Sequence, residues 1–440
     1  MASMGMYRVR QGRTLAGDFV APGDKSITHR AYLFGAIAGG VTTIRDANDG
    51  EDCERSLAAA EMLGALVQRE EHVLRIGGRD LRLRAPDAPI DCGNSGTSMR
   101  LLAGIVAGQP FATTLIGDES LSRRPMARIL APLRLMGADI AAREDRLPPL
   151  TIRGGVLAGI AYDSPVASAQ VSTCILLAAL TASGVTRVTL PGPARDHTER
   201  MLPLFGAELD VQSAALGGRS IQVQGGTRLR GTSLRIPGDL SAAAFLLAAA
   251  AAQPGAEVTA LGVNTNPTRA GLLEVLAAMG ASVSMAQTRI ECGEPVADVT
   301  VRGPERLRAF DVPREWVPRL IDEAPAWIIA ATAAEGTSRL TGASELRVKE
   351  SDRIVALARN LAAVGATVRE LPDGLEVTGG PVHGGHIQAH LDHRIVMAFA
   401  ALGCRTRDAV TFDDVDSVAT SFPSFFTTLG LLGADVEEVA

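Results

Sequence analysis

The sequence contains only two lysines, Lys25 and Lys349, among its 43 lysine and arginine side chains. Arginine stays protonated at every relevant pH, whereas lysine is a compact charge whose pKa shifts with its surroundings. Lys25 lies in "APGDKSITHR", and Lys349 lies in "ELRVKESDR" beside Glu350. Ammonium groups beside carboxylates can stabilise anions and transfer protons. We therefore interpret both stretches as parts of a catalytic site for an anionic ligand; the alternative is that two lysines survived by chance.

Six apolar stretches rich in alanine and leucine are predicted to form buried helices, because a helix that is apolar on all sides has no face for water. Each opens with small polar residues, and they begin near Lys25, Asn94, Ser168, Asp239, Asp322 and Asp392. A helix N-terminus favours anions, since its N–H groups are unpaired and carry partial positive charge. Arginines lie close to these starts: Arg30, Arg100, Arg124, Arg195, Arg353 and Arg394. We expect these groups to converge on a highly anionic ligand, although any one arginine taken alone is better explained as a solvated surface residue.

A repeated motif predicts the elements that position these residues. Gly-Ala-x-(Val/Ile/Leu) follows an amphipathic stretch and precedes an alternating one at Gly64, Gly137, Gly206, Gly280, Gly365 and Gly433. This pattern is typical of a helix that ends at a glycine and turns into a strand. We therefore predict an α/β fold of two similar domains, each with three repeated units that contain a buried helix and short mixed β-strands.

The domain boundaries are predicted from a repeated Pro-Gly-Asp sequence at residues 22–24 and 237–239. We place the two interdomain crossings there, about half the chain apart. One domain then comprises residues 1–22 plus 238–440, and the other comprises residues 23–237. The first strand of the chain, before Pro22, belongs with the C-terminal half in this interpretation.

Composition excludes several classes of function. The net charge of −6 over 440 residues argues against a nucleic-acid binder, since there is no basic tract. The longest apolar run is too short for a membrane span, and the N-terminus lacks a signal-peptide pattern, so we expect a cytoplasmic protein without membrane contact.

The cysteines and histidines are not predicted to bind a metal. We interpret the five cysteines as reduced thiols. Four histidines in "HGGHIQAHLDH" could suggest a metal site, but the Gly-Gly is typical of a turn, and we expect no metal.

The motifs taken together resemble the 5-enolpyruvylshikimate-3-phosphate (EPSP) synthase family, in its second, bacterial sequence class. The resemblance rests on "PGDKSITHR", "GNSGTSMR", "RRPM", "SAQV", "RDHTERML", "ELRVKESDR", "DHR" and "ATSFPSFF", which cover almost the whole chain. It implies the enolpyruvyl transferase fold, with two domains that close over substrates in a cleft.

The resemblance also implies a reaction in the shikimate pathway of aromatic amino acid biosynthesis. The 5-hydroxyl of shikimate 3-phosphate attacks C2 of phosphoenolpyruvate while C3 is protonated, and the adduct then loses phosphate. The two substrates are the only partners implied, in a monomer that needs no cofactor and is a glyphosate target. Fixed cations can stabilise the developing charge without a metal.

Residue roles follow from the resemblance. Lys25, Asp322, Glu350 and Lys349 are implied as catalytic, with Asp322 as the base for the 5-hydroxyl and Glu350 as the acid for C3. Shikimate 3-phosphate would be bound by Lys25, Ser26, Arg30, Ser168, Ala169, Gln170, Arg195, Asp322 and Lys349. Phosphoenolpyruvate would be bound by Lys25, Asn94, Gly96, Arg124, Gln170, Arg353, His393 and Arg394.

Three positions depart from the family pattern. Thr420 stands where a lysine is found in the first class, Ala194 replaces a serine, and Ser172, which we interpret as peripheral, replaces a common lysine. Two alternative functions share part of the pattern. UDP-N-acetylglucosamine enolpyruvyl transferase has the same chemistry, but it typically has Lys-Asn where this chain has Lys25-Ser26, and a loop cysteine that is absent before "RRPM". A non-catalytic anion-binding relic would not need the intact lysines and carboxylates.

Overall fold

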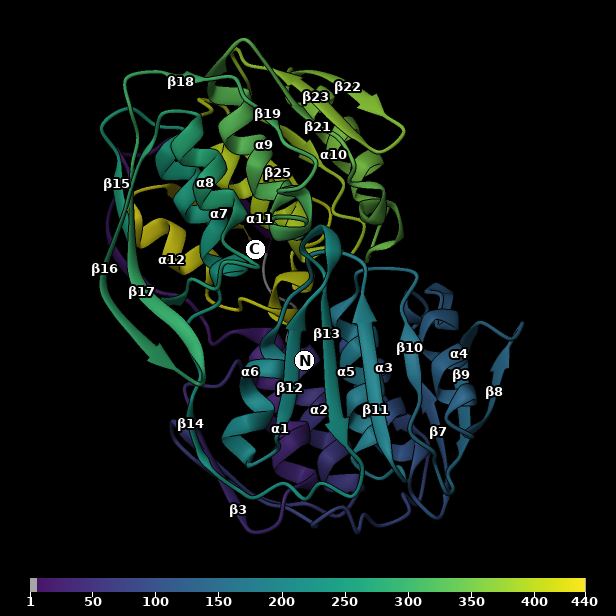
Figure 1. Cartoon of the computed structure of the whole chain (residues 1–440). Helices are drawn as coiled ribbons and strands as arrows, with labels where there is room; N and C mark the ends of the chain where they lie inside the picture. The colour runs from purple at the N-terminus through teal and green to yellow at the C-terminus, as the bar shows by residue number, and fades with distance from the viewer. Residues whose placement is uncertain (1–5, 440) are drawn as a thin grey trace. The chain divides into compact units, whose positions relative to one another are not determined.

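The structure is a computed structural model that describes residues 6–439, and the chain divides into two compact units (Figure 1). The N-terminal unit consists of Gly23–Pro237 together with Ile290–Glu294. The C-terminal unit consists of the chain up to Pro22, Gly238–Arg289 and the chain from Pro295 onward. The short segment Ile290–Glu294, around the turn between two strands, belongs to the N-terminal unit. The sequence predicts it in the other domain, which comprises residues 1–22 plus 238–440.

The N-terminal unit contains three four-stranded sheets of the same design. In each sheet the first two strands are parallel and the others are antiparallel. The strands, in spatial order, are β14 (Ser233–Arg235), β3 (Val41–Arg45), β5 (Val73–Gly77) and β4 (Leu66–Glu70); β6 (Ile90–Asp91), β7 (Ala112–Ile116), β9 (Leu147–Arg153) and β8 (Asp139–Arg143); and β10 (Ala161–Asp163), β11 (Val185–Leu190), β13 (Arg219–Gln224) and β12 (Leu209–Ser213).

The C-terminal unit repeats this design. Its sheets, each given from the parallel pair onward, are β2 (Ala16–Val20), β15 (Glu257–Asn264), β17 (Glu294–Arg302) and β16 (Ser282–Glu291); β19 (Asp311–Val312), β21 (Thr337–Leu340), β23 (Gly374–Thr378) and β22 (Thr367–Leu371); and β24 (Gly385–Ile387), β25 (Val410–Phe412), β1 (Met6–Arg10) and β26 (Asp435–Val439). A short pair, β18 (Leu307–Arg308) and β20 (Ala334–Glu335), adds to them. The first two strands of the chain thus lie in different sheets of this unit, since β1 pairs with β25 and β26 whereas β2 pairs with β15.

Each unit has a core built around three buried helices, as the sequence predicts. They are α1 (Lys25–Ile37), α3 (Gly96–Ala107) and α5 (Ala169–Ala179) in the N-terminal unit, and α7 (Leu240–Ala251), α9 (Ala324–Ala333) and α11 (His393–Gly403) in the C-terminal unit. Every residue of α7 is buried, which agrees with a sequence that is apolar on all sides. Side chains cap most of these helices at Asp24, Ser95, Ser168, Asp239 and Asp392.

The glycine of each repeat ends an outer helix, and this prediction is confirmed. The outer helices are α2 (Glu51–Met62), α4 (Ala127–Leu135), α6 (His197–Met201) continued by η2 (Leu202–Phe205), α8 (Gly271–Ala278), α10 (Arg353–Ala363) and α12 (Phe425–Leu432). All six glycines have positive φ, from 78° at Gly365 to 128° at Gly433. Glycine adopts this conformation without the steric penalty of a Cβ, so it lets the chain leave the helix and enter the next strand.

Candidate functional site

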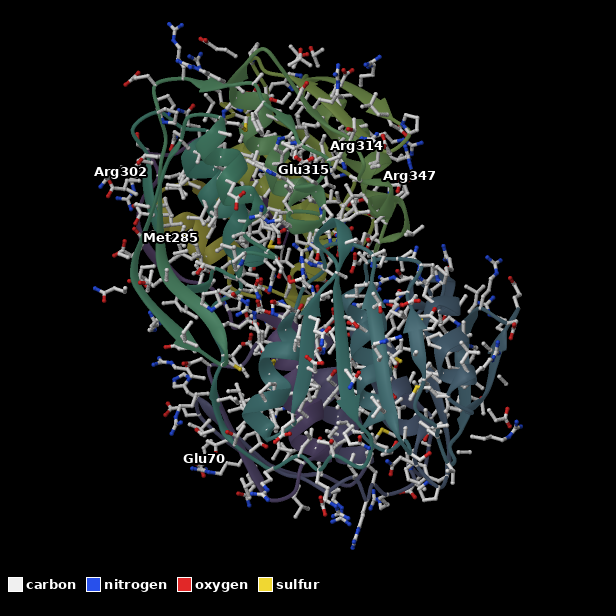
Figure 2. The ribbon with its side chains drawn as sticks, in the orientation of Figure 1. Glu70, Met285, Arg302, Arg314, Glu315 and Arg347 are labelled. Carbon is white, nitrogen blue, oxygen red and sulfur yellow. The ribbon has the colours of Figure 1, made fainter. Side chains whose placement is uncertain are left out.

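The arginines of the chain fall into two groups that differ in burial. Arg302 and Arg314, labelled in Figure 2, extend from the surface of the C-terminal unit and pair with Glu257 and Asp373 respectively. By contrast, Arg353 and Arg30 are only 1% and 3% exposed. A guanidinium is costly to bury without partners. The buried group therefore consists of arginines that the fold holds in place, and it includes four of the predicted site arginines, Arg30, Arg124, Arg353 and Arg394.

In the N-terminal unit, Lys25 is the first residue of α1, and the Asp24 side chain caps the helix by accepting from the Ile27 N–H at 3.1 Å. The Lys25 ammonium forms an ion pair with Asp52 of α2, with 2.9 Å between Nζ and Oδ2. Both side chains are less than one-fifth exposed. Ser26 follows on the same turn, so the ammonium and the Ser26 hydroxyl belong to one helix start.

Arg30 lies one turn further along α1 and is held by hydroxyl groups of two other elements. Its Nε donates to Thr198 Oγ1 at 2.8 Å, and its Nη2 donates to Thr173 Oγ1 at 3.0 Å. Its Nη1 donates to the Ser26 carbonyl at 2.8 Å. Burial lowers the pKa of Arg30 to about 10. The guanidinium therefore remains charged at neutral pH but is poorly solvated, a state that an anionic ligand would stabilise.

Three of the predicted phosphoenolpyruvate residues, Asn94, Gly96 and Arg124, lie together at the start of α3. Arg124 donates to the Asn94 carbonyl at 3.2 Å and to the Asn94 side chain. Gly96 is the first residue of α3, and a Cβ at this position would lie 2.7 Å from Arg100 Nη1 and 3.6 Å from Arg124 Nη1. Arg100 also donates to Gln170 Oε1 at 2.7 Å. The guanidinium groups of Arg100 and Arg124 therefore both lie next to Gly96, and Arg100 connects this position to the Gln170 amide.

The start of α5 supplies the remaining residues of this group. The Ser168 hydroxyl accepts from the Val171 N–H at 3.5 Å, and Ala169 is the first residue of the helix. The Gln170 amide donates to Thr97 of α3 at 2.9 Å, so these two helix starts are directly linked. Arg195 precedes α6, and its carbonyl accepts from Arg219 Nη2 at 2.6 Å.

In the C-terminal unit, Lys349 lies beside Asp322. The distance from Lys349 Nζ to Asp322 Oδ1 is 3.2 Å, and the distance to Glu345 Oε1 is 3.0 Å. Burial alone would lower the pKa of Lys349, but the carboxylates of Asp322 and Glu345 outweigh it, so the pKa is raised. Lys349 is therefore held as an ammonium. In this arrangement Lys349 is a compact positive charge between the carboxylates of Asp322 and Glu345.

Arg353, the first residue of α10, connects the other carboxylates of this unit. It contacts Glu350 at 2.7 Å through Nη2, Asp322 at 3.6 Å through Nη1, and Asp392 at 2.8 Å through Nε. Burial opposes the charge, but these three carboxylates raise the pKa of Arg353 well above its usual value. Ser351 donates to the same Asp392 carboxylate at 3.0 Å.

Asp392 also caps α11 by accepting from the Arg394 N–H at 3.0 Å, and this cap places the last two predicted residues. His393 is the first residue of α11 and is buried. Arg394 donates to the Asp322 carbonyl at 2.9 Å. Asp322, Lys349, Glu350, Arg353, His393 and Arg394 therefore form one cluster in the C-terminal unit, and the other predicted residues lie in the N-terminal unit.

Three carboxylates that hold the basic groups in place were not among the predicted site residues. Asp52 pairs with Lys25, Glu345 pairs with Lys349, and Asp392 pairs with Arg353. Asp392 had a local signal, because an aspartate before an apolar stretch is a favoured N-cap. Asp52 had none, since it is one of several acidic residues in the first turn of α2.

The three positions that depart from the family pattern, Thr420, Ala194 and Ser172, each make a hydrogen bond within their own unit. The Thr420 hydroxyl donates to the Ser417 carbonyl at 2.8 Å, and the Ala194 carbonyl accepts from Arg219 at 2.7 Å. Ser172 is fully buried in α5, and its hydroxyl donates to the Ala169 carbonyl at 3.1 Å.

The histidine-rich segment lies partly at the surface. His383 contacts the Gly384 carbonyl at 2.6 Å, and His386 contacts Thr411 at 3.1 Å. Among residues 6–439 no group of three or more His, Cys, Asp or Glu side chains is arranged to hold a metal ion. Within the same range, no helix has the length and apolar character to cross a membrane.

Comparisons with known proteins show which family the chain belongs to. The family model for EPSP synthase (3-phosphoshikimate 1-carboxyvinyltransferase) matches residues 9–429. The chain belongs to the EPSP synthase family. A relative from Acidithiobacillus ferrooxidans named 3-phosphoshikimate 1-carboxyvinyltransferase is 50% identical over 424 residues, which is 96% of each chain. One from Pelobacter propionicus with the same name is 46% identical over 97% of this chain and 98% of the relative.

Solved structures show the same relationship. An EPSP synthase from Acinetobacter baumannii superimposes with a TM-score of 0.87 at 43% identity, over 98% of this chain and all of that chain. The fold is therefore the enolpyruvyl transferase fold that the sequence predicts. This chain is an enzyme, a carboxyvinyltransferase of the shikimate pathway. The comparisons do not favour a UDP-N-acetylglucosamine enolpyruvyl transferase or a non-catalytic relic.

Proposed function

We propose that the two clusters of this EPSP synthase family member act together on shikimate 3-phosphate and phosphoenolpyruvate. The 5-hydroxyl of shikimate 3-phosphate adds to C2 of phosphoenolpyruvate while C3 gains a proton. Loss of a C3 proton and of phosphate then forms the enolpyruvyl ether. The observation that carries the proposal is the cluster in which Arg353 contacts both Asp322 and Glu350 beside Lys349. It combines fixed positive charge with two carboxylates, which an addition and elimination involving acid and base requires.

We propose distinct roles for the two carboxylates. Asp322 accepts the proton of the 5-hydroxyl, and Glu350 delivers a proton to C3. The raised pKa of Lys349 keeps its ammonium charged, so Lys349 stabilises anionic groups rather than serving as a base in the unliganded enzyme. Lys25 supplies the second ammonium, which contacts both substrates and assists proton transfer.

We propose that each substrate is held by its own set of residues, which comes from both units. Shikimate 3-phosphate is held by Lys25, Ser26, Arg30, Ser168, Ala169, Gln170 and Arg195, together with Asp322 and Lys349. Phosphoenolpyruvate is held by Lys25, Asn94, Gly96, Arg124, Gln170, Arg353, His393 and Arg394. Arg100 joins this second group, because it contacts Gln170 and lies closest to a Cβ placed at Gly96. Glyphosate is proposed to occupy the phosphoenolpyruvate position.

The proposal requires the two units to act as domains that draw together around the substrates. We also propose a cytoplasmic monomer. All five cysteines are free, which fits a reducing compartment. Each unit has its own buried core, so neither needs a second chain to cover it.

A single-turnover experiment tests the function. Purified enzyme in excess over both substrates is quenched at short times, and phosphate and the enolpyruvyl ether are quantified. We expect phosphate to appear with the ether in equal amounts, and only when both substrates are present. Phosphate release from phosphoenolpyruvate without shikimate 3-phosphate, or conversion of UDP-N-acetylglucosamine instead, would contradict the proposal.

Small-angle scattering tests whether the two domains draw together. With shikimate 3-phosphate and an unreactive phosphoenolpyruvate analogue the radius of gyration should become smaller, and an unchanged radius would argue against closure.

A further inference from the structure

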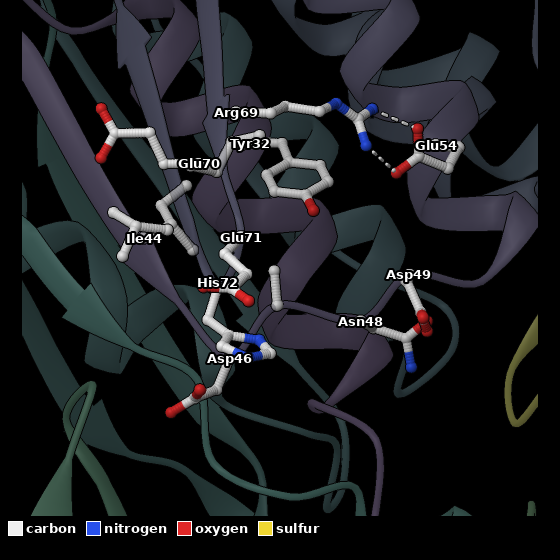
Figure 3. Close-up of a pocket in the computed structure, with 13 residues that line it drawn as sticks. Tyr32, Ile44, Asp46, Asn48, Asp49, Glu54, Arg69, Glu70, Glu71 and His72 are labelled. Atoms are coloured by element: carbon white, nitrogen blue, oxygen red, sulfur yellow. Dashed lines mark hydrogen bonds and ion pairs between the residues drawn. The ribbon is translucent and has the colours of Figure 1, made fainter. Parts of the chain in front are cut away.

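The N-terminal unit contains a pocket away from the residues assigned to the reaction (Figure 3). It lies beside the first sheet of the unit, between α1, the segment that follows β3, and the turn between β4 and β5. Its volume is about 200 Å³, whereas one water molecule needs roughly 10–15 Å³ by this measure. The pocket can therefore hold a small organic molecule.

A buried tyrosine provides the first indication of a ligand. Tyr32 of α1 is only 3% exposed, yet its hydroxyl has no hydrogen-bond partner among residues 6–439. Figure 3 shows the hydroxyl pointing into the space between the other lining side chains. Burial raises the pKa of Tyr32, so the hydroxyl stays protonated and can both donate and accept a hydrogen bond. The Tyr32 side chain is thus held in place by burial while its hydroxyl is open to the pocket, so this hydroxyl is suited to a ligand.

Charge provides the second indication. Three lining carboxylates are neutralised by arginines: Glu54 by Arg69, Glu70 by Arg75 and Asp46 by Arg235.

The two other lining carboxylates, Asp49 and Glu71, are not neutralised in this way. In the part of the chain that the structure describes, neither lies within ion-pair distance of a basic side chain. The pocket therefore has an excess negative charge of about two, which attracts a cation.

The apolar part of the lining is formed by Ile44, Val73, Leu74 and Ala47, and the polar side chains of Asn48, Arg69 and His72 complete it. We propose that this pocket binds a small organic cation, a protonated primary amine with an apolar body. The ammonium group would lie between the carboxylates of Asp49 and Glu71 and donate to the Tyr32 hydroxyl. The apolar body would pack against Ile44, Val73 and Leu74. In small-molecule sites the apolar side chains usually supply most of the contact area, and a few polar groups fix the orientation of the ligand.

The position of the pocket links this site to Lys25. Asn48, which lines it, is fully buried and donates from Nδ2 to the Gly23 carbonyl at 2.8 Å. The Asn48 N–H donates to Thr28 of α1 at 3.1 Å. A few residues later, Asp52 pairs with Lys25. A ligand that orders residues 46–52 therefore acts on the segment that positions the Lys25 ammonium. This second part of the inference rests on the proposed function.

Binding is tested with benzylamine as the probe and benzyl alcohol as its neutral counterpart, by calorimetry and by two-dimensional NMR of the whole chain. We expect benzylamine to bind at one site and benzyl alcohol to bind at least several-fold more weakly. Glu71→Gln and Asp49→Asn should each weaken benzylamine by roughly two- to five-fold, the range of a partly exposed ion pair. Tyr32→Phe should weaken it by roughly three- to ten-fold, as expected for one lost hydrogen bond.

Glu61→Gln is the matched control, since Glu61 is an exposed acid of α2 outside the pocket. It should leave the affinity unchanged. Equal affinity for benzyl alcohol, or equal weakening by Glu61→Gln and Glu71→Gln, would overturn the site. These measurements do not depend on turnover, so they stay interpretable even if the proposed reaction is wrong.

The link to Lys25 is tested by steady-state kinetics at saturating benzylamine. We expect the KM for phosphoenolpyruvate to change at least two-fold in the parent enzyme, and Tyr32→Phe should need a roughly three- to ten-fold higher benzylamine concentration for the same change. By reciprocity, phosphoenolpyruvate should change the affinity for benzylamine by the same factor by which benzylamine changes the equilibrium dissociation constant of phosphoenolpyruvate, which calorimetry measures. If neither quantity changes while benzylamine binds, the link is refuted and the site stands.

Discussion

Replacing Asp392 with asparagine should destabilise the C-terminal unit, because the Asp392 carboxylate is the main partner of a buried guanidinium. The side chains of Asp392 and Arg353 are 0% and 1% exposed, and Asp392 accepts from Arg353 at 2.8 and 3.1 Å. Asparagine has nearly the same shape and is an equally good N-cap. The substitution therefore removes the charge while keeping the cap of α11.

Removing one partner of a buried ion pair costs about 3–5 kcal/mol, because the other charge is left buried. Arg353 keeps its contact with Glu350 at 2.7 Å, so we expect the lower end, about 3 kcal/mol. For a unit of roughly 150–250 residues, 1 kcal/mol shifts the melting temperature by about 2–4 °C. Asp392→Asn should therefore lower the Tm of the C-terminal unit by about 6–12 °C.

Thermal unfolding followed by circular dichroism measures this shift, with Asp408→Asn as the control because Asp408 is an exposed aspartate of the same unit. Asp392→Ala should cost about 1 kcal/mol more than Asp392→Asn, since it also loses the cap. A Tm change for Asp392→Asn no larger than that for Asp408→Asn would refute the argument that Arg353 depends on this carboxylate.

Three further predictions concern the proposed reaction. Lys25→Arg keeps a positive charge but loses the ammonium, so turnover should fall by roughly 10² or more, the scale of a positioned proton-transfer group; near-normal turnover would mean that the lysine is there by chance. Asp322→Asn and Glu350→Gln should each slow single-turnover chemistry while shikimate 3-phosphate still binds by calorimetry, and joint loss of binding and of the cooperative melt would make these residues structural. Gly96→Ala places a methyl 2.7 Å from the flexible end of Arg100, so the protein should still fold. The longer glyphosate should then be excluded more than phosphoenolpyruvate, raising its inhibition constant by a larger factor than the KM; equal factors would mean that Gly96 does not face the ligand.

The sequence alone determined the repeating architecture and the family. Each glycine that ends an outer helix was visible because its φ is set by local geometry, as at Gly64 and Gly433. The buried helices were visible because their composition leaves no polar face, as in α7. Both signals are short-range, so they need no knowledge of the rest of the chain. The motifs around Lys25 and Lys349, together with those between them, are specific enough to indicate the family by themselves.

Only the tertiary structure decided which charged side chains pair with one another and how their pKa values are shifted. Asp52 and Lys25 come from different helices, and Asp392 is far from Arg353 in sequence. The raised pKa of Lys349 likewise depends on Asp322, which is brought close by folding. No sequence pattern encodes such distances, because they follow from how whole helices and sheets pack. For the same reason, the pocket at Tyr32 could not be inferred from the sequence, since its walls come from two helices, three strands and the segments between them.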